Sequence, residues 1–240
     1  NGKTAVYRVV DGEVTYDFSS MKGAALEDDL KQRDLTINAM GYDLAAQAVI
    51  DPLGGRRDLC SRRIRFVSKK ALESDPLRML RAFRFAAVLS FGLSRDSKDW
   101  ICKEAWRITG SAPERIHTEL FRLMTVKNSA SYVKQAVETG VLIRVIPELE
   151  ACSGCSQNEF HHGDVLEHLL GAYEAMEWVL SYFQVLWPDF SQPIARYLEG
   201  KDRRVLLKWA ALLHDIGKPP TRHRDPLGRI RFIGHETEGA

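Results

Sequence analysis

The sequence has few cysteines and no long apolar run. Its four cysteines in 240 residues (Cys60, Cys102, Cys152 and Cys155) are too few for a disulfide scaffold, so we expect a reducing, cytoplasmic location. No apolar stretch reaches about 18 residues, and no membrane span is predicted. Neither a signal peptide nor an internal repeat is visible, and no pattern fixes an oligomeric state.

The composition is that of a globular protein with a substantial core. Apolar residues make up 45% of the chain and charged residues 28%. The length suits one large domain or two to three small ones. The chain does not begin with Met and stops just after Gly234-His235-Glu236. We therefore expect a piece of a longer protein, truncated at both ends.

Charge is unevenly distributed, although the net charge is only +2. Residues 145–195 contain no Lys or Arg and eight Asp or Glu, whereas residues 54–84 contain ten Lys or Arg and three Asp or Glu. The basic segment is suited to contact phosphates, and the acidic segment would repel them. The alternative is that both are ordinary solvated faces.

Hydrophobic periodicity predicts an α+β fold that is helical over most of its length. Alternating residues on either side of Asp11-Gly12 indicate a hairpin, and helical spacing dominates after residue 69. Seams near residues 68 and 150 divide the chain into 1–68, 69–150 and 151–240. Strands are expected at 4–10, 13–18, 48–50 and 62–67, and helices at 34–41, 75–90, 96–107, 113–125, 129–138, 163–187 and 203–216.

The most informative segment is Asp75-Pro-Leu-Arg78-Met-Leu-Arg81-Ala-Phe-Arg84. It places one carboxylate and three guanidinium groups at three-residue steps within an otherwise apolar helix, all on one half of its circumference. The arginine fork pairs well with phosphate or with a base edge, and an adjacent carboxylate adds acceptors. A structural Asp–Arg network between helices is an equally good interpretation of the spacing.

A second polar group lies at Arg33-Asp34, before an expected helix. Arg33 would suit a phosphate and Asp34 a ribose hydroxyl, near a helix N-terminus that favours anions. Asn38, one turn later, would hold the loop. A simple N-cap at Asp34 explains the same residues.

These motifs resemble those of class II tRNA nucleotidyltransferases and bacterial poly(A) polymerases. The resemblance covers four motifs in order over about ninety residues. They are Arg33-Asp34-Leu-Thr-Ile-Asn38, Asp51-Pro-Leu-Gly54-Gly55-x-x-Asp58-Leu, Asp75-Pro-Leu-Arg78-x-x-Arg81-x-x-Arg84-Phe, and Glu114-Arg115-Ile-x-x-Glu119-Leu.

The resemblance implies a partial nucleotidyltransferase palm with a mixed sheet, an all-α neck and a helical C-terminal domain. It implies addition of C and/or A from CTP and ATP to the 3′ end of tRNA. Asp75 and Arg78 would read the base and Asp34 would serve the ribose. By the same resemblance, Arg33, Asn38, Arg78, Arg81 and Arg84 bind the nucleotide, while Glu114, Arg115 and Glu119 are structural.

Two departures from the family pattern affect the expected chemistry. Ser74 stands where the family usually has Glu, so base selection would be looser or supported differently. The Asp-x-Asp motif that holds catalytic Mg²⁺ is missing, and in the family it lies upstream, so we expect this chain alone to be inactive in nucleotide addition. Asp17 is the remaining candidate catalytic carboxylate, although it also reads as a surface residue at a strand end.

The C-terminal part contains Leu212-Leu-His214-Asp215-Ile-Gly-Lys218, which resembles the core of HD phosphohydrolases. Adjacent His and Asp offer two metal ligands, and a distant His must complete the set. His168 and His235 are the expected partners, and a divalent transition metal is the expected ion. The alternative for each lone histidine is a satisfied core residue.

Other interpretations stay open at this point. The HD part could be the working site, hydrolysing nucleotides or 2′,3′-cyclic phosphates; the enzyme could be a poly(A) polymerase; or the chain could be a non-catalytic RNA-binding remnant. Cys152-Ser-Gly-Cys155 with His161 and His162 has zinc-ligand spacing, but no second CxxC supports it.

Overall fold

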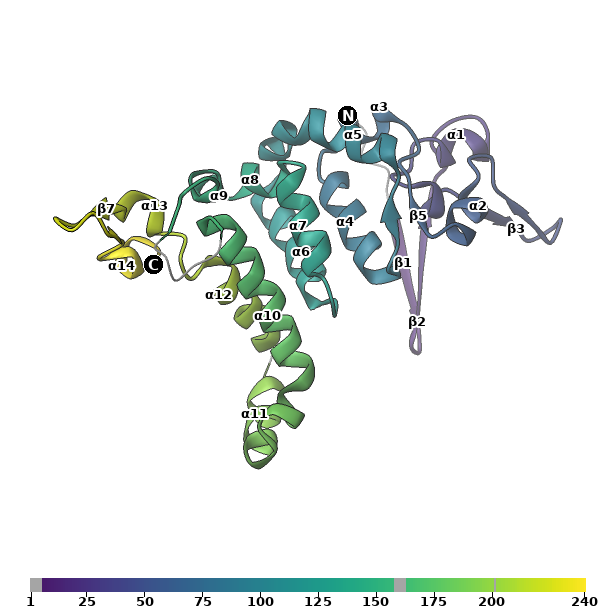
Figure 1. The fold of residues 1–240 in the computed structure, drawn as a ribbon. Coiled ribbons are helices and arrows are strands. Elements are labelled where there is room, and N and C mark those ends of the chain that lie inside the picture. The colour runs from purple at the N-terminus through teal and green to yellow at the C-terminus, as the bar shows by residue number, and fades with distance from the viewer. Residues whose placement is uncertain (1–5, 158–162, 201) are drawn as a thin grey trace.

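The computed structural model describes residues 6–157, 163–200 and 202–240. Figure 1 shows an elongated molecule in which strands and short helices occupy the N-terminal end and stacked helices fill the middle. A long helix, α10 (Val165–Leu186), and the smaller α11 (Ser191–Leu198) project from this body, and the C-terminal elements lie at the end opposite the N-terminal strands. The fold is α+β and mostly helical, as the sequence predicts.

The N-terminal hairpin is built from β1 (Val6–Asp11) and β2 (Val14–Ser19), which confirms the two expected strands over their described residues. The strands pair antiparallel with Arg8 opposite Asp17. Gly12 in the turn has φ +59°, a conformation that glycine adopts without a steric penalty. Both strands are exposed along their whole length, so the hairpin contributes little to the core.

The segment after the hairpin differs from the expected helix at 34–41, because only the 3₁₀ turn η1 forms. The backbone there is used for pairing: the Thr36 N–H donates to the Arg65 carbonyl and the Val67 N–H donates to the Asp34 carbonyl. These hydrogen bonds to residues 65 and 67 therefore compete with those of a helix over 34–41. The elements of this region are α1 (Leu26–Leu30), η1 (Thr36–Asn38), β3 (Gly41–Asp43), β4 (Ala48–Ile50), α2 (Gly55–Cys60), β5 (Arg63–Ile64) and β6 (Gly92–Leu93).

The sheets of the described residues are small, two-stranded ladders. β3 pairs antiparallel with β4, and β5 pairs parallel with β6, the expected strand at 62–67 being reduced to two ladder residues. An isolated bridge joins Leu35 to Phe66. The helix α2, which the sequence did not predict, begins where Asp51 accepts hydrogen bonds from the Gly55 and Arg56 N–H groups at 2.7 and 2.9 Å.

The expected helix at 75–90 begins later than predicted. Asp75 is extended, with φ −149° and ψ 96°, because the following Pro76 disfavours the helical conformation at the residue before it. The helices of this middle region are α3 (Lys69–Ser74), α4 (Arg78–Leu89), α5 (Arg95–Glu104), the 3₁₀ helix η2 (Ala105–Gly110), α6 (Pro113–Thr125), α7 (Ala130–Glu138), α8 (Val141–Val145) and α9 (Glu148–Cys152).

One large apolar core runs through these helices and into the C-terminal part, and Leu180, Phe183 and Leu198 form a second, smaller cluster. Met79, Leu80 and Phe83 from α4 are fully buried, and α6 contributes Leu123 and Met124. Burial of side chains of this size is worth about 1.5–3 kcal/mol each, so this core anchors α4 rigidly. The opposite side of α4 is thereby fixed as the side available to a ligand.

The C-terminal part is organised around α10 (Val165–Leu186), which packs against α12 (Arg203–Leu213) and α7. Asp164 and Glu167 form a capping box at the start of α10. The remaining elements are η3 (Pro188–Phe190), α11 (Ser191–Leu198), α13 (Lys218–Thr221), β7 (His223–Arg224), β8 (Ile230–Arg231) and α14 (His235–Glu238). Over the described parts of the chain, no helix has both the length and the apolar character needed to span a membrane.

A buried ion pair joins the C-terminal helices to the loop between α6 and α7. Lys208 of α12 and Glu177 of α10 form a salt bridge, and their side chains are 7% and 6% exposed. Lys208 also donates to the Met124 and Val126 carbonyls, each at 2.8 Å. Glu177 accepts from the Ser129 and Ala130 N–H groups. Every charge in this cluster is thus compensated within the protein.

Candidate functional site

A cavity of about 1130 Å³ lies beside α4, between this helix, the segment around residues 29–38 and the base of the N-terminal hairpin. We call it the α4 cavity. Most of the predicted nucleotide-binding residues line it together. They are Arg33, Asp34, Asn38, Asp75, Arg78 and Arg81, and they are joined there by Phe85 and Arg115.

Asp34 is the best-connected acid of the α4 cavity. Its Oδ1 accepts from the Leu35 N–H and the Asn38 side chain, and its Oδ2 accepts from Arg81 Nε at 2.8 Å and forms an ion pair with Nη2 at 2.6 Å. Burial alone would raise the pKa of Asp34, but the Arg81 guanidinium and these hydrogen bonds hold it below its ordinary value. Asp34 is therefore ionised at neutral pH and does not serve as the N-cap that its sequence position suggested.

Arg33, the neighbour of Asp34, points to a different acid. Its Nη2 lies 2.7 Å from Asp29 Oδ2 in an i,i+4 ion pair, and its side chain is 51% exposed. About half of the side chain is therefore exposed, and Arg33 also lines the α4 cavity, which suits a contact with an anion that arrives from solvent.

Arg78 is held by main-chain oxygens. Its Nη1 donates to the Arg33 and Ala71 carbonyls at 3.1 and 2.9 Å, and its Nη2 donates to the Gln32 carbonyl at 2.9 Å. Burial lowers the pKa of the Arg78 guanidinium, although it stays charged at neutral pH. Three main-chain carbonyls therefore hold the Arg78 guanidinium in place without neutralising its positive charge.

Asp75 and Arg84 have partners on α6. Arg115 Nη2 donates to Asp75 Oδ2 at 2.8 Å, so Arg115 reaches the cavity although the sequence suggested a purely structural role. Arg84 Nε donates to Glu119 Oε2 at 2.6 Å, its side chain is 13% exposed, and it is not among the residues that line the cavity. The geometry thus places Arg84 in the α4–α6 contact, and its expected contact with a nucleotide stays a prediction.

Asp17 lies apart from these groups, on the exposed hairpin. It accepts from Arg8 Nε and Nη2 at 2.7 and 2.8 Å. The hydrogen bond from Arg8 holds the pKa of Asp17 below its ordinary value. Asp17 does not line the α4 cavity, and no other described carboxylate lies beside it in a possible ion-binding group.

The palm Mg²⁺ that the resemblance implies does not fit the acids of the described residues. Asp29, Asp34 and Asp75 of the α4 cavity are each paired with an arginine, and Asp17 is paired with Arg8. Mg²⁺ in nucleotidyl transfer needs carboxylate oxygens that converge on the ion, and these do not converge.

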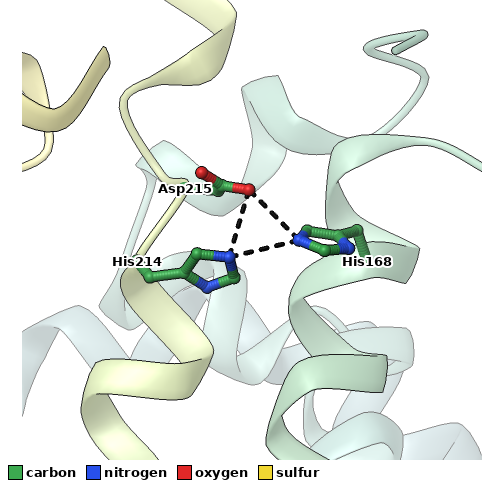
Figure 2. A group of neighbouring side chains, drawn as sticks. All are labelled: His168, His214 and Asp215. Atoms are coloured by element: carbon green, nitrogen blue, oxygen red, sulfur yellow. Dashed lines mark hydrogen bonds and ion pairs between the residues drawn. The ribbon is translucent and has the colours of Figure 1, made fainter. Parts of the chain in front are cut away.

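A separate cluster forms where α10 approaches the end of α12. Figure 2 shows His168, His214 and Asp215 pointing toward one another from two different helical segments. His168 Nε2 and His214 Nε2 are 3.1 Å apart, and each lies 3.1 Å from Asp215 Oδ2. Donor atoms that bind one metal ion at about 2 Å lie roughly 3 Å from one another. The three distances between these side chains therefore fit a shared ion.

The groups behind this cluster orient its donors. His214 Nδ1 lies 3.0 Å from the Ala211 carbonyl, and donation to that oxygen leaves Nε2 as an acceptor toward a metal. His235 Nδ1 is hydrogen-bonded in the same way to the Phe232 carbonyl, and its Nε2 lies 3.2 Å from Asp215 Oδ1. Two imidazoles and a carboxylate, with a third imidazole behind them, fit a divalent transition metal.

Two further features shape this group of possible metal ligands, His168, His214, Asp215 and His235, which we call the metal cluster. Lys218 Nζ donates to Gln157 and lies 2.7 Å from Asp215 Oδ2, so a cation of the protein itself balances the buried carboxylate. At Gly217, a Cβ atom would lie 2.2 Å from the His235 carbonyl, which shows how closely α14 packs here. Glycine at this position therefore permits the approach that brings His235 to Asp215.

The possible zinc ligands do not form a site within the described residues. Cys152 is buried and Cys155 is partly buried, while the other expected ligands, His161 and His162, lie outside the residues that the structure describes. Burial raises the pKa of the Cys152 thiol to about 12, which opposes the thiolate form that zinc requires.

Comparison with protein families assigns three consecutive parts of the chain. Residues 3–65 match the poly A polymerase head domain, residues 90–153 match the probable RNA and SrmB-binding site of polymerase A, and residues 165–240 match the HD domain. The matches thus follow one another along the chain as a polymerase head, an RNA-binding region and an HD domain.

Curated relatives agree with this assignment. An A-adding tRNA nucleotidyltransferase of Deinococcus radiodurans is 38% identical over 240 residues, which cover 98% of this chain and 50% of that protein. A CC-adding tRNA nucleotidyltransferase of Thermus thermophilus is 36% identical over 244 residues, covering 99% and 51%. The chain is similar to tRNA nucleotidyltransferases over nearly its whole length, and it spans about half the length of the curated relatives it matches.

Solved structures show the same fold. The Bacillus stearothermophilus CCA-adding enzyme in complex with CTP is 33% identical with a TM-score of 0.55, covering 58% of this chain and 37% of that one. A tRNA nucleotidyltransferase complexed with a primer tRNA and an incoming ATP analog has a TM-score of 0.63 at 24% identity, covering 88% and 59%. At 24% identity the latter likeness concerns the fold alone.

Proposed function

We propose that the whole protein is a cytoplasmic tRNA nucleotidyltransferase, which adds C and/or A from CTP and ATP to the 3′ end of tRNA. The observation that carries this proposal is the α4 cavity, where Asp34, Asp75, Arg78 and Arg81 come together from two distant segments. The names of the relatives in Deinococcus and Thermus and the CTP complex of the Bacillus enzyme support the same substrates.

In this reaction the 3′ hydroxyl of the RNA attacks the α-phosphate of the nucleotide, and pyrophosphate leaves. Arg78 and Asp75 present donors and an acceptor to the edge of the base. Asp34, fixed by Arg81 and Asn38, accepts a hydrogen bond from the ribose, and Arg33 meets the phosphates. Because the described residues lack a Mg²⁺ ligand set, we derive these roles for binding and orientation alone. RNA contacts would involve mainly backbone and shape, and would weaken with salt.

The experiment uses the full-length protein with labelled CTP and ATP supplied separately to tRNA that lacks its 3′ end. We expect incorporation of at least one of the two nucleotides. Arg78→Ala should reduce kcat/KM at least about a hundred-fold, because a charged group with paired hydrogen bonds is lost. Arg196→Ala, on the exposed surface of α11, removes the same side chain far from the cavity and should leave the activity unchanged. No incorporation of either nucleotide by the wild type would refute the proposal.

A second activity is supported by the metal cluster. The convergence of His168, His214 and Asp215 favours a phosphohydrolase site for nucleotides or 2′,3′-cyclic phosphates, coexisting with nucleotide addition. A bound transition metal would supply Lewis acidity there, and these residues together with His235 would hold it. Hydrolysis of a 2′,3′-cyclic nucleotide to its 2′- or 3′-monophosphate with added Mn²⁺, Co²⁺ or Ni²⁺ tests this, and Asp215→Ala should abolish this hydrolysis while nucleotide addition persists.

A further inference from the structure

An aromatic residue, Phe85, forms part of the wall of the α4 cavity beside the arginines. Successive helix residues are rotated by 100°, so position 85 falls between positions 78 and 81 when the helix is viewed along its axis. Arg84 is rotated away from this stripe and lies outside the cavity lining. The ligand-facing stripe of α4 is therefore Arg78, Arg81 and Phe85.

The ring of Phe85 is held in place by two guanidinium groups. The Arg84 Cζ atom lies over the ring at 4.2 Å from its centroid, and the Arg81 Cζ atom lies at 5.6 Å. Arg84 is itself fixed by its 2.6 Å bond to Glu119, whose side chain is 5% exposed. A chain of contacts that begins in the α4–α6 interface thus orients the ring. A guanidinium group over a ring is attracted to its π-electrons, so these contacts favour an aromatic side chain over an aliphatic one.

We propose that Phe85 is the surface on which a nucleobase stacks during nucleotide addition. The inference depends on the proposed function, because it assigns a ligand to the same cavity. A base that enters beside Arg81 meets the donors of that guanidinium and the apolar ring of Phe85 next to each other. Aromatic stacking tolerates any base, since every base has a π-face, and so Phe85 adds affinity without dictating whether C or A enters.

The base has two possible sources, the incoming nucleotide and the last residue of the RNA. Phe85 lies seven residues beyond Arg78, or about 10 Å along the helix axis. That separation exceeds the spacing of adjacent stacked bases, so a base read at Asp75 and Arg78 need not be the one that meets Phe85. The two sources predict different kinetic consequences and are separated by the experiment below.

The test measures KM and kcat of the full-length enzyme carrying Phe85→Leu, with Phe85→Tyr and Phe85→Trp as variants that keep a ring. Loss of stacking should raise one KM about ten-fold with a smaller change in kcat, while the Tyr and Trp variants stay within about two-fold of the wild type. A raised KM for CTP or ATP identifies the incoming nucleotide, and a raised KM for tRNA identifies the RNA end. Phe121→Leu is the matched control, because Phe121 is a partly buried aromatic outside the cavity.

Fluorescence gives an independent readout that does not depend on turnover. The tryptophan of Phe85→Trp should be quenched on titration with CTP, ATP or tRNA, but not with tripolyphosphate, which has no base. If the leucine variant does not fold, this titration decides the question. Unchanged KM values in Phe85→Leu, or equal responses to tripolyphosphate and nucleotides, would overturn the inference while leaving the proposed function intact. A wild type that incorporates no nucleotide would instead refute the proposed function itself.

Discussion

Arg115 of α6 braces Asp75 in front of α4 through an ion pair of 2.8 Å. Ser74, which stands where the family usually has Glu, donates its hydroxyl to the Ala71 carbonyl and turns away from this pair. Arg78, the other expected base-reading group, is held by three main-chain carbonyls. In this chain α6 thus holds Asp75, and the backbone holds Arg78.

The first prediction concerns this brace. Arg115→Gln should change the ratio of kcat/KM for CTP and ATP several-fold, because Asp75 is then free to rotate. The free energy of unfolding should fall by less than about 1 kcal/mol, since the Arg115 side chain is 54% exposed and such pairs contribute little. Steady-state kinetics with each nucleotide and urea unfolding measure the two effects. Arg115→Lys keeps the charge and should restore most of the ratio, whereas an unchanged ratio in the glutamine variant would show that Arg115 plays no part in selection.

The second prediction concerns the buried pair Lys208–Glu177. Glu177→Gln should lower the free energy of unfolding by about 3–5 kcal/mol, because it leaves Lys208 charged and unpaired in the protein interior. The double variant Glu177→Gln/Lys208→Met should recover much of that loss. Urea unfolding of the wild type, both single variants and the double variant measures the coupling, and strictly additive losses would contradict it.

The third prediction is a pH dependence of stability from Asp34. Folding lowers its pKa, so its contribution is fully present above the pKa of an unfolded aspartate, about 3.9, and is lost as the pH falls through the lower folded value. Asp34→Asn should therefore cost roughly 1–3 kcal/mol at pH 7 and progressively less below pH 4. Melting temperatures of both proteins between pH 7 and the acid transition test this. A difference that stays constant into acid would exclude Asp34 as its source.

The fourth prediction concerns the metal cluster. Co²⁺ should raise the melting temperature of the protein and give a visible absorption band, because its ligands are present in the folded state. His214→Ala should abolish both signals, and His235→Ala should weaken them. His223→Ala is the matched control, since this nearby exposed histidine lies outside the cluster. Identical shifts in the His214 variant and the wild type would place the ion elsewhere.

Most helices and the residues of both sites could be predicted from local patterns. Helix α6 spans Pro113–Thr125, the predicted range, because its apolar periodicity and its N-terminal proline are local signals. The 34–41 helix was wrong because its backbone pairs with residues far along the chain, and no local pattern reports such a pairing. Helix α2 was missed because a Gly-Gly turn signal precedes it.

The sequence predicted most of the residues named at the α4 cavity, but not the contacts among them. The spacing predicts Arg78, Arg81 and Arg84 together as ligand-binding residues, whereas the structure places Arg78 and Arg81 in the cavity lining and Arg84 outside it, because three-residue steps drift around the helix. The same helical periodicity could have predicted that Phe85 lies on the face of Arg78 and Arg81, since residues 78, 81 and 85 follow an i, i+3, i+7 pattern. The contact of Arg115 with Asp75 could not be predicted from the sequence, because it depends on how α6 packs against α4.

The network around Lys208 limits how the molecule can be divided. Its ammonium group satisfies two carbonyls at the end of α6, and the carboxylate of Glu177 satisfies two N–H groups at the start of α7. A fragment that stopped before α10 would leave all four main-chain groups without these partners. Truncations before α10 are therefore expected to lose solubility and cooperativity even though every residue that lines the α4 cavity is retained, and biochemical dissection should begin from point substitutions.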